Sequence, residues 1–425
     1  MRQILLCLLL SVTLSAAFAQ KNCVHQAYQQ QLLAENPQLS GAYEKVEAFT
    51  RSLAFRTPAT VNGTGTGSSN SSTKIIAIPV VVHVLWNNSA QNISNEQILS
   101  QIEVLNNDYR GKNEDHSLVP SYFASLAADC GIQFTLAKLD PNGNNTTGII
   151  RKQTGAQSFS YNDYAKKSAM GGDDPWDADS YLNIWVCSLA DGILGYSSVP
   201  GGPKNIDGVV ISTGVFGTIN VNGPFNKGRT TVHEIGHWLN LRHIWGDASC
   251  GDDKVDDTPT QQAATRGCPG GAERFSCGST EHGDMYMNYM DFTDDACMFM
   301  FSNGQRDRMR ALFEAGGVRS AILVSNGLKG DGLPVTVTAP DQGAMGFNVD
   351  LYPNPTTSSI TIHSKEDAGC IGKSAVIYNY LGQMMKTVIL QSSLQQVDVS
   401  NLKNGLYFIK IDGVKTKAMT KFVKQ

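Results

Sequence analysis

A short histidine-rich segment has the clearest chemical potential in this chain. It reads His-Glu-Ile-Gly-His at residues 233–237, and His243 follows six residues later. On a helix, His233 and His237 would project from one face because they are four residues apart, so both imidazoles could bind one metal ion. Glu234 could then accept a proton from water at the metal without binding the metal itself. Three protein ligands with an open fourth position are typical of a catalytic zinc site, and the sequence predicts one here.

The surroundings of this segment resemble the metzincin metalloproteases, in which an extended zinc motif is followed by a turn that contains a methionine. Here the turn would be Asn288–Phe292, with Met290 as an apolar floor under the zinc ligands. One position differs from the common pattern, because Asn240 stands where glycine is usual. The backbone must leave the helix sharply at this point, and asparagine tolerates the left-handed conformation better than most residues.

A more specific resemblance is to the bacterial secreted branch of the pappalysin family. It spans about residues 74–325, and the segments that carry it are 233–247, 250–259, 288–298, 183–187 and 207–211. The resemblance implies a secreted zinc-dependent endopeptidase, made as a latent precursor, with an α/β (α+β) zincin fold. Zinc-activated water would hydrolyse the peptide bond with Glu234 as general base. Phe292 takes a position where many metzincins carry a zinc-approaching tyrosine.

The same resemblance implies further features of the site. It implies the disulfides Cys250–Cys277 and Cys268–Cys297, in a segment poor in apolar residues. It also implies a preference for Arg or Lys after the scissile bond, with Asp294 or Asp295 as the acid of the specificity pocket. Spacing alone leaves Cys130 and Cys187 open, either as a third pair or as two buried thiols; the apolar pattern around Cys187 favours buried thiols.

A run of acidic residues follows the third histidine, and clustered carboxylates in a glycine-rich, disulfide-bound loop suit calcium. The candidate calcium ligands are Asp253, the Val255 carbonyl, Asp257 and Thr258. The alternative is a solvated acidic loop that binds no ion.

Cys23 lies just after the predicted signal cleavage site, and a thiolate is a good zinc ligand. This arrangement resembles that of some pappalysins, in which a propeptide cysteine binds the zinc and keeps the precursor latent. Cleavage near Arg51, Arg56 or residues 59–73 would then release Cys23. The alternative is a disulfide from Cys23 to Cys130 or Cys370.

The N-terminus indicates export. Residues 1–19 combine Arg2, an apolar run at 4–14 and Ala-Phe-Ala at 17–19, which predicts a signal peptide. The net charge of −4 gives no indication of nucleic-acid or anionic-membrane binding.

The chain divides into segments of different character. After the signal peptide we expect a propeptide and linker at 20–73, with helices at 28–33 and 42–54 and a flexible run at 61–73. A catalytic domain at 74–328 should contain buried strands at 75–85, 132–139, 181–188 and 209–212 and a helix at 95–109 capped by Ser94. A linker at 329–346 would follow.

Residues 347–425 alternate as short strands between turns, which predicts an all-β, Ig-like sandwich. Tyr-Pro-Asn-Pro at 352–355 and the terminal lysines resemble the C-terminal sorting domain of type IX secretion cargo. That resemblance implies the type IX machinery as a partner and a secreted or cell-surface protein. An Ig-like substrate-binding module is the alternative for this domain. For the whole chain, the alternative to a protease is a non-enzymatic surface protein that has kept the fold.

Overall fold

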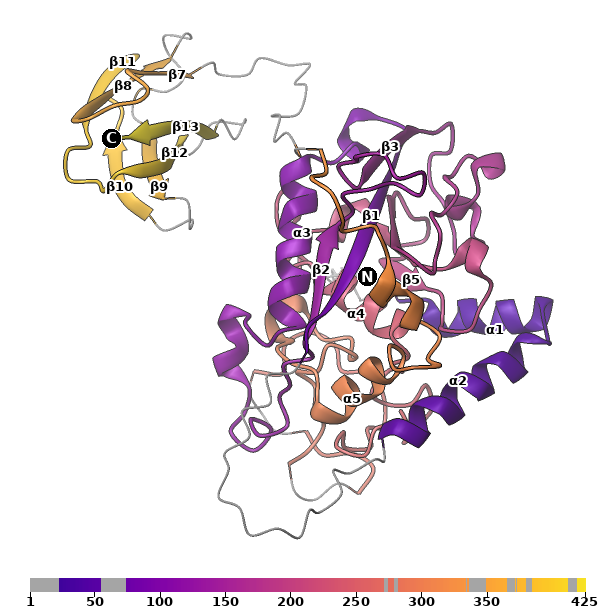
Figure 1. The fold of residues 1–425 in the computed structure, drawn as a ribbon. Coiled ribbons are helices and arrows are strands. Elements are labelled where there is room, and N and C mark those ends of the chain that lie inside the picture. The colour runs from indigo at the N-terminus through magenta and orange to yellow at the C-terminus, as the bar shows by residue number, and fades with distance from the viewer. Residues whose placement is uncertain are drawn as a thin grey trace, which may run out of the picture. The chain divides into compact units, whose positions relative to one another are not determined.

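The computed structural model describes residues 23–54, 74–270, 274–278, 282–333, 335, 349–364, 371, 373–379, 384–411 and 419–425. The predicted signal peptide and the predicted linker at 61–73 lie outside these residues, as do Arg56 and Cys370. The chain forms two compact units, Met1–Val337 and Thr338–Gln425 (Figure 1). The boundary between the units falls inside the predicted linker at 329–346. Among the described residues, no helix is long and apolar enough to cross a membrane.

The first unit is built on a mixed sheet with strand order β2-β1-β4-β6-β5, in which β3 also pairs with β1. The strands are β1 (Ile76–Trp86), β2 (Ile132–Leu136), β3 (Ile149–Gln153), β4 (Leu182–Cys187), β5 (Gly195–Ser197) and β6 (Val209–Ser212). Only β5 runs antiparallel, at the edge. The sequence predicted β1, β2, β4 and β6, because long apolar runs are typical of parallel strands buried on both faces. It missed β3, whose sequence Ile-Ile-Arg-Lys-Gln is largely polar, and β5, which has three residues.

Alternate residues of the central strands pack into two different cores. Val84, Val186 and Ile211 face a core that includes Val232 and Ile235 of the helix α4 (Arg229–Trp238). Their neighbours Leu85, Trp185 and Val210 belong to a second core. Because successive side chains of a strand point to opposite faces, the second core lies on the sheet face away from α4.

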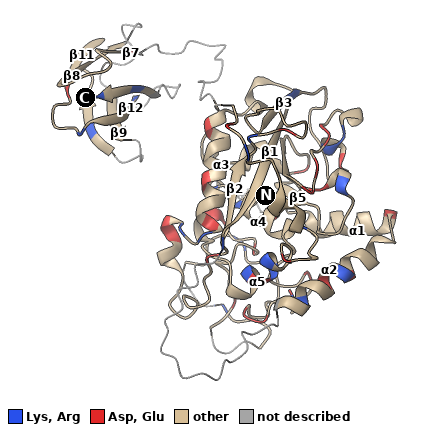
Figure 2. Cartoon of the chain, in the orientation of Figure 1, with Lys and Arg blue, Asp and Glu red and all other residues tan. Residues whose placement is uncertain are grey.

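Two further helices frame the first core. Helix α3 (Asn95–Asp108) begins where the sequence predicts, since the Ser94 hydroxyl accepts from the Gln97 amide. Helix α5 (Asn303–Ala311) begins with a capping box formed by Ser302 and Gln305. In Figure 2, α5 is coloured in part as basic residues, and it contacts helix α2 (Leu39–Ala54), which is distant in the chain.

The predicted propeptide contributes two helices, α1 (His25–Glu35) and α2, both of which contact the predicted catalytic domain. Helix α1 lies against β5, and α2 lies against α5 (Figure 1). Both helices extend beyond the ranges that the sequence predicts. Short 3₁₀ helices occupy 89–91, 114–118, 164–166, 168–170, 204–206, 213–215, 295–297 and 320–324.

The second unit consists of two antiparallel sheets, of order β10-β9-β12-β13 and β11-β8-β7. The strands are β7 (Val349–Tyr352), β8 (Ser359–Ser364), β9 (Ser374–Asn379), β10 (Met384–Ile389), β11 (Leu394–Asp398), β12 (Gly405–Ile411) and β13 (Met419–Lys424). One apolar core, including Ile360, Ile377 and Phe422, joins residues of both sheets. The predicted all-β architecture is confirmed.

Candidate metal centre

Helix α4 is held at its start by a carboxylate from a distant part of the chain. Asp295 accepts hydrogen bonds from the backbone amides of Lys227 and Arg229, at 2.9 and 3.1 Å. These amides lie at the start of the helix, where backbone donors have no intrahelical partner. Asp295, suggested above as a specificity acid, therefore caps α4, and it is fully buried.

The end of α4 positions its second histidine. Asn240 adopts φ 71°, the predicted left-handed conformation. The amides of Asn240 and Leu241 donate to His237 O at 3.0 Å and Gly236 O at 2.9 Å, which closes the last turn of the helix. The Leu241 carbonyl then lies 2.9 Å from Nδ1 of His237 and fixes the orientation of its ring.

Met290 packs directly beneath α4. A Cβ atom placed on Gly236 would lie 2.5 Å from the Met290 sulfur, so this glycine is needed for the close approach. The Met290 side chain is buried. It has the position of an apolar floor below the histidines.

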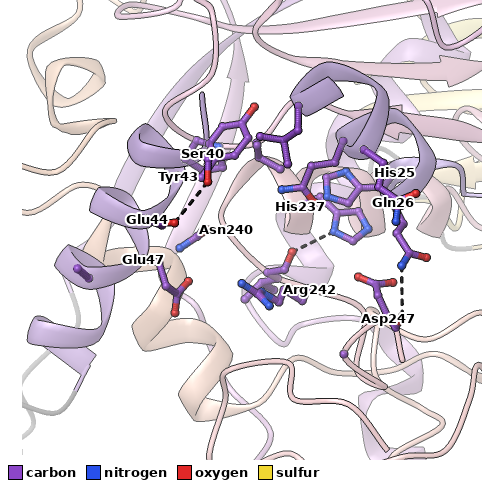
Figure 3. Close-up of a pocket in the computed structure, with 18 of the residues that line it drawn as sticks. His25, Gln26, Ser40, Tyr43, Glu44, Glu47, His237, Asn240, Arg242 and Asp247 are labelled. Atoms are coloured by element: carbon purple, nitrogen blue, oxygen red, sulfur yellow. Dashed lines mark hydrogen bonds between the residues drawn. The ribbon is translucent and has the colours of Figure 1, made fainter. Parts of the chain in front are cut away.

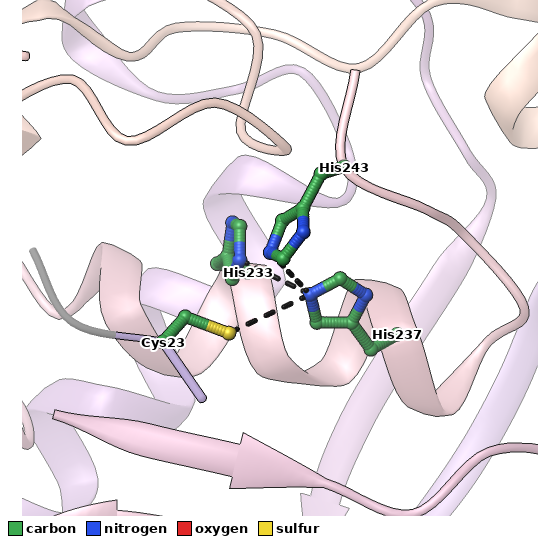
Figure 4. A group of neighbouring side chains, drawn as sticks. All are labelled: Cys23, His233, His237 and His243. Atoms are coloured by element: carbon green, nitrogen blue, oxygen red, sulfur yellow. Dashed lines mark hydrogen bonds between the residues drawn. The ribbon is translucent and has the colours of Figure 1, made fainter. Parts of the chain in front are cut away.

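Three imidazoles converge through their Nε2 atoms. His237 Nε2 lies 3.2 Å from His233 Nε2 and 3.2 Å from His243 Nε2 (Figure 4). Each Nδ1 faces an acceptor: Tyr289 O at 2.7 Å for His233, Leu241 O for His237 and the Asp247 carboxylate for His243. Acceptors at Nδ1 place the ring proton there, so the three Nε2 lone pairs face one another. A cation at the centre would remove the repulsion between these lone pairs. Zinc fits the observed 3.2 Å separations, because Zn–N bonds of about 2.0–2.1 Å place the nitrogens of a tetrahedral site about 3.3–3.4 Å apart.

Cys23 joins this cluster from the pro-segment, the described residues 23–54. Its sulfur lies 3.7 Å from His237 Nε2, and the four ligand atoms all lie within 4.8 Å of one another. A short parallel bridge between Cys23 and Gly195 of β5 holds the backbone in place. Cys23 takes part in neither disulfide of the described chain. The structure thus brings together all four residues that the sequence predicts as ligands in the latent form.

His25 is a neighbour that the sequence did not predict. Its ring stacks on His237 with centroids 3.8 Å apart, and its Nδ1 lies 3.1 Å from Ser197 O. Burial, then the proximity of His243, lowers the pKa of His25 to about 3, so the ring is neutral. The Cys-x-His spacing of residues 23–25 is the signal that could have shown it.

Glu234 is fully buried beside the histidines. A Cβ atom on Gly195 would lie 2.9 Å from Glu234 Cγ, so the edge strand β5 forms one wall of the carboxylate's space. Phe292 forms another side of the site, with its ring 4.9 Å from that of His243 and 4.8 Å from that of Trp245.

The loop after His243 contains both disulfides that the resemblance implies, Cys250–Cys277 and Cys268–Cys297. Cys130 and Cys187 are separate buried thiols, as favoured above.

Three of the four candidate calcium ligands meet in this loop. The Thr258 hydroxyl lies 2.8 Å from both Asp253 Oδ2 and the Val255 carbonyl. Asp257 is not brought to them, since its carboxylate accepts from Ser302 Oγ at 2.6 Å and Gly304 N at 2.8 Å and so joins the loop to α5. Burial raises the pKa of Asp253 to about 7.

A cavity of about 580 Å³ lies between parts of the two pro-segment helices and the catalytic part of the unit. Its lining is mostly polar and includes Gln26, Glu44, Arg242 and Asp247 (Figure 3). Two of its lining residues also join α2 to the catalytic part: Glu47 forms a bidentate ion pair with buried Arg308, and Asn240 donates to Thr50 Oγ1 at 3.1 Å. The pro-segment therefore touches the site through Cys23 and His25 and again through α2.

Comparison with known proteins agrees with this site. Residues 166–314 match the M43 peptidase family, described as Pregnancy-associated plasma protein-A, and residues 350–425 match a secretion system C-terminal sorting domain. An extracellular metalloprotease of Pyricularia oryzae is 30% identical over 286 residues, which cover 64% of this chain and 87% of the relative. The chain therefore belongs to the pappalysin-like M43 metalloproteases.

Two solved structures are more similar in sequence. Mature mirolysin of Tannerella forsythia, in complex with a cleaved peptide, is 49% identical, with a TM-score of 0.58, over 59% of this chain and 97% of that one. A promirolysin mutant from the same organism is 43% identical, with a TM-score of 0.63, over 72% of this chain and 97% of that one. The chain is thus a metalloendopeptidase with a type IX sorting domain, and the non-enzymatic alternative is not supported.

Proposed function

We propose that this protein is a zinc-dependent endopeptidase, exported by a signal peptide and the type IX machinery and kept latent by its own pro-segment. The observation that carries the proposal is the convergence of three Nε2 lone pairs on one point, with Cys23 Sγ on the fourth side. His233, His237 and His243 would hold zinc, and Cys23 would complete a closed coordination in the precursor.

Bound zinc would polarise the scissile carbonyl and lower the pKa of the attacking water. Glu234 accepts the proton of that water and delivers it to the leaving amine. Its burial against β5 keeps bulk water away from the carboxylate. Met290 supports the histidines from below, and the Tyr289, Leu241 and Asp247 oxygens keep each ring in the required tautomer.

Latency follows from the same geometry. While Cys23 occupies the open side of the histidine cluster, neither water nor a peptide carbonyl can reach it. Cleavage near Arg51, Arg56 or within 59–73 would sever the pro-segment and allow Cys23 to leave.

The experiment compares full-length precursors with wild-type sequence, Cys23→Ala, Glu234→Ala and both changes. Each is incubated with denatured casein, and its zinc content is measured by mass spectrometry. We expect Cys23→Ala to cleave casein without prior processing. The double variant should bind zinc stoichiometrically yet cleave nothing.

Cys130→Ala serves as a matched control, because it also removes a thiol outside the disulfides but does so in the core beside α3 and β2. Continued latency of Cys23→Ala would contradict the role of Cys23. Cleavage by the double variant would contradict the role of Glu234.

We also propose that calcium binds in the disulfide-bound loop. Asp253, the Val255 carbonyl and Thr258 already converge, and the hard oxygen ligands suit calcium. Asp257 would contribute by fixing the loop to α5, or would bind the ion if its bonds to Ser302 and Gly304 opened.

A further inference from the structure

The pro-segment has a second anchor on the sheet face away from α4. Tyr28 of α1 is 2% exposed and packs in the second core with Leu85, Trp185 and Tyr196. Its ring lies 4.9 Å from that of Tyr196. This contact involves none of the candidate zinc ligands.

The phenol group meets a polar centre inside this apolar core. Tyr28 Oη donates to Asp163 Oδ1 at 2.9 Å, and Oδ2 lies 3.0 Å away. Lys166 Nζ lies 2.9 Å from Asp163 Oδ1 and donates to the Ile206 carbonyl at 2.8 Å. Lys166 is fully buried and Asp163 is 4% exposed. Burial, then the charge of Asp163, raises the pKa of Tyr28, so the phenol stays protonated and can donate.

Aromatic rings surround the cation. Lys166 Nζ lies 5.1 Å from the centroid of Tyr28, 5.7 Å from that of Trp185 and 5.0 Å from that of Tyr196. An ammonium group over aromatic faces is attracted by their negative centres, more strongly when it is desolvated. Trp185, Tyr196 and the ion pair of Asp163 with Lys166 all belong to the catalytic part of the chain. Of the residues in this group, Tyr28 alone comes from the pro-segment.

The pocket distinguishes tyrosine from phenylalanine. Phenylalanine would fill the same volume but would remove one donor to a buried carboxylate. A hydrogen bond to a charged group stabilises a complex more than a bond between neutral groups does. Without the phenol, the buried Asp163 carboxylate would also lose one of the donors that offset its removal from water. A mostly polar cavity lies between α1, α2 and the catalytic part, and Leu32 of α1 packs in the same second core as Tyr28.

We propose that Asp163, Lys166, Trp185 and Tyr196 form a binding site for a tyrosine side chain. Its ligand is the severed pro-segment, which this site retains on the enzyme after cleavage and independently of the metal. The proposal rests on the severing step of the proposed function, but not on zinc binding or catalysis. A freshly cleaved enzyme would therefore remain inhibited, with Cys23 still held at the histidines, until Tyr28 left its pocket.

The test uses the full chain with Glu234→Ala and Cys23→Ala, so that neither catalysis nor the thiol contributes. A recognition site for a sequence-specific viral protease is inserted within 59–73 and cut. Size-exclusion chromatography over time then measures the dissociation rate of the severed segment. This parent is compared with Tyr28→Phe, Asp163→Asn and the matched control Tyr43→Phe, whose hydroxyl has no hydrogen-bond partner among the described residues.

We expect the parent and Tyr43→Phe to retain the segment equally. Tyr28→Phe should release it about 10- to 100-fold faster, the range for losing a hydrogen bond to a buried charge. Adding Asp163→Asn to Tyr28→Phe should change the rate less than Asp163→Asn changes it in the parent, because the bond between the two side chains is already absent. Melting temperatures of the uncut chains show whether each variant is folded.

Two results would overturn the proposal. One is loss of the parent's segment within the dead time of the column. The other is equal release rates for Tyr28→Phe and Tyr43→Phe in folded chains. Neither result would affect the proposed peptidase mechanism, which this catalytically inactive chain does not report.

Discussion

Replacing Gly195 with alanine should reduce the turnover of the mature enzyme while leaving its metal site intact. Gly195 is the first residue of β5, and its missing side chain leaves the space that Glu234 occupies. A Cβ atom there would lie 2.9 Å from Glu234 Cγ and 3.1 Å from Glu234 Oε1. The Val210 carbonyl, at 3.1 Å, prevents the new methyl group from retreating toward the sheet.

The size of the effect follows from these distances. Carbon atoms pack best at about 3.5–4.0 Å, so the Glu234 side chain must withdraw by roughly 0.6–1 Å. A misplacement of about 1 Å in a reacting group can reduce the rate by about 10²-fold. We therefore expect kcat to fall by about 10- to 100-fold, which corresponds to about 1.4–2.7 kcal/mol in the activation free energy.

The assay compares kcat and KM on a fluorogenic peptide for the mature forms of wild type, Gly195→Ala and Gly155→Ala. A methyl group at the control position Gly155 would meet no atom within 4 Å apart from its chain neighbours, so alanine fits there. Zinc content and melting temperature establish that the site and the fold persist. An unchanged kcat in a folded, zinc-loaded Gly195→Ala enzyme would refute the view that β5 positions the base.

Three further changes test other parts of the structure. Burial raises the pKa of Asp115, but the Arg229 guanidinium outweighs burial and holds this pKa well below its usual range. The ion pair of Asp115 therefore stabilises the fold above about pH 4, and this stabilisation is lost as the pH falls further. The free energy of unfolding of Asp115→Asn, measured by urea titration, should depend less on acid pH than that of the wild type. Calcium should raise the melting temperature of the wild type more than that of Asp253→Asn, and equal shifts would argue against a calcium site. Phe292→Tyr should not reduce kcat, because the ring already lies against His243; a severe loss would show that the position serves packing alone.

The sequence predicts the centre of this site better than its boundaries. The spacing of His233 and His237 needs only helix geometry, and the tolerance of Asn240 for positive φ, which lets the chain turn back toward His243, is an intrinsic property of the residue. Both predictions are local. The long strands β1 and β4 were equally accessible, because buried parallel strands have continuous apolar runs.

The features that were missed depend on contacts between distant segments. Strand β5 has three residues, too few for a pattern, yet its Gly195 contacts both Cys23 and Glu234. Helix α1 is predicted at 28–33, but its contact with the catalytic part is not, because the helix is rich in glutamine and its buried stripe of Tyr28 and Leu32 is narrow. Asp257 is one of several aspartates close together in the sequence, so sequence alone does not set it apart. Only the tertiary structure shows that its carboxylate binds the start of α5.

The position of Trp185 makes activation observable without any substrate. Its indole lies in the core that α1 completes, 5.7 Å from Lys166 and fully shielded from solvent. When α1 departs, the polarity around this ring changes, and so should its emission wavelength. Fluorescence of this indole would then report the physical departure of the pro-segment, whereas peptide hydrolysis reports only the freeing of the histidines. The delay between cleavage of the chain and the change in emission would measure how long the severed pro-segment stays bound to the enzyme.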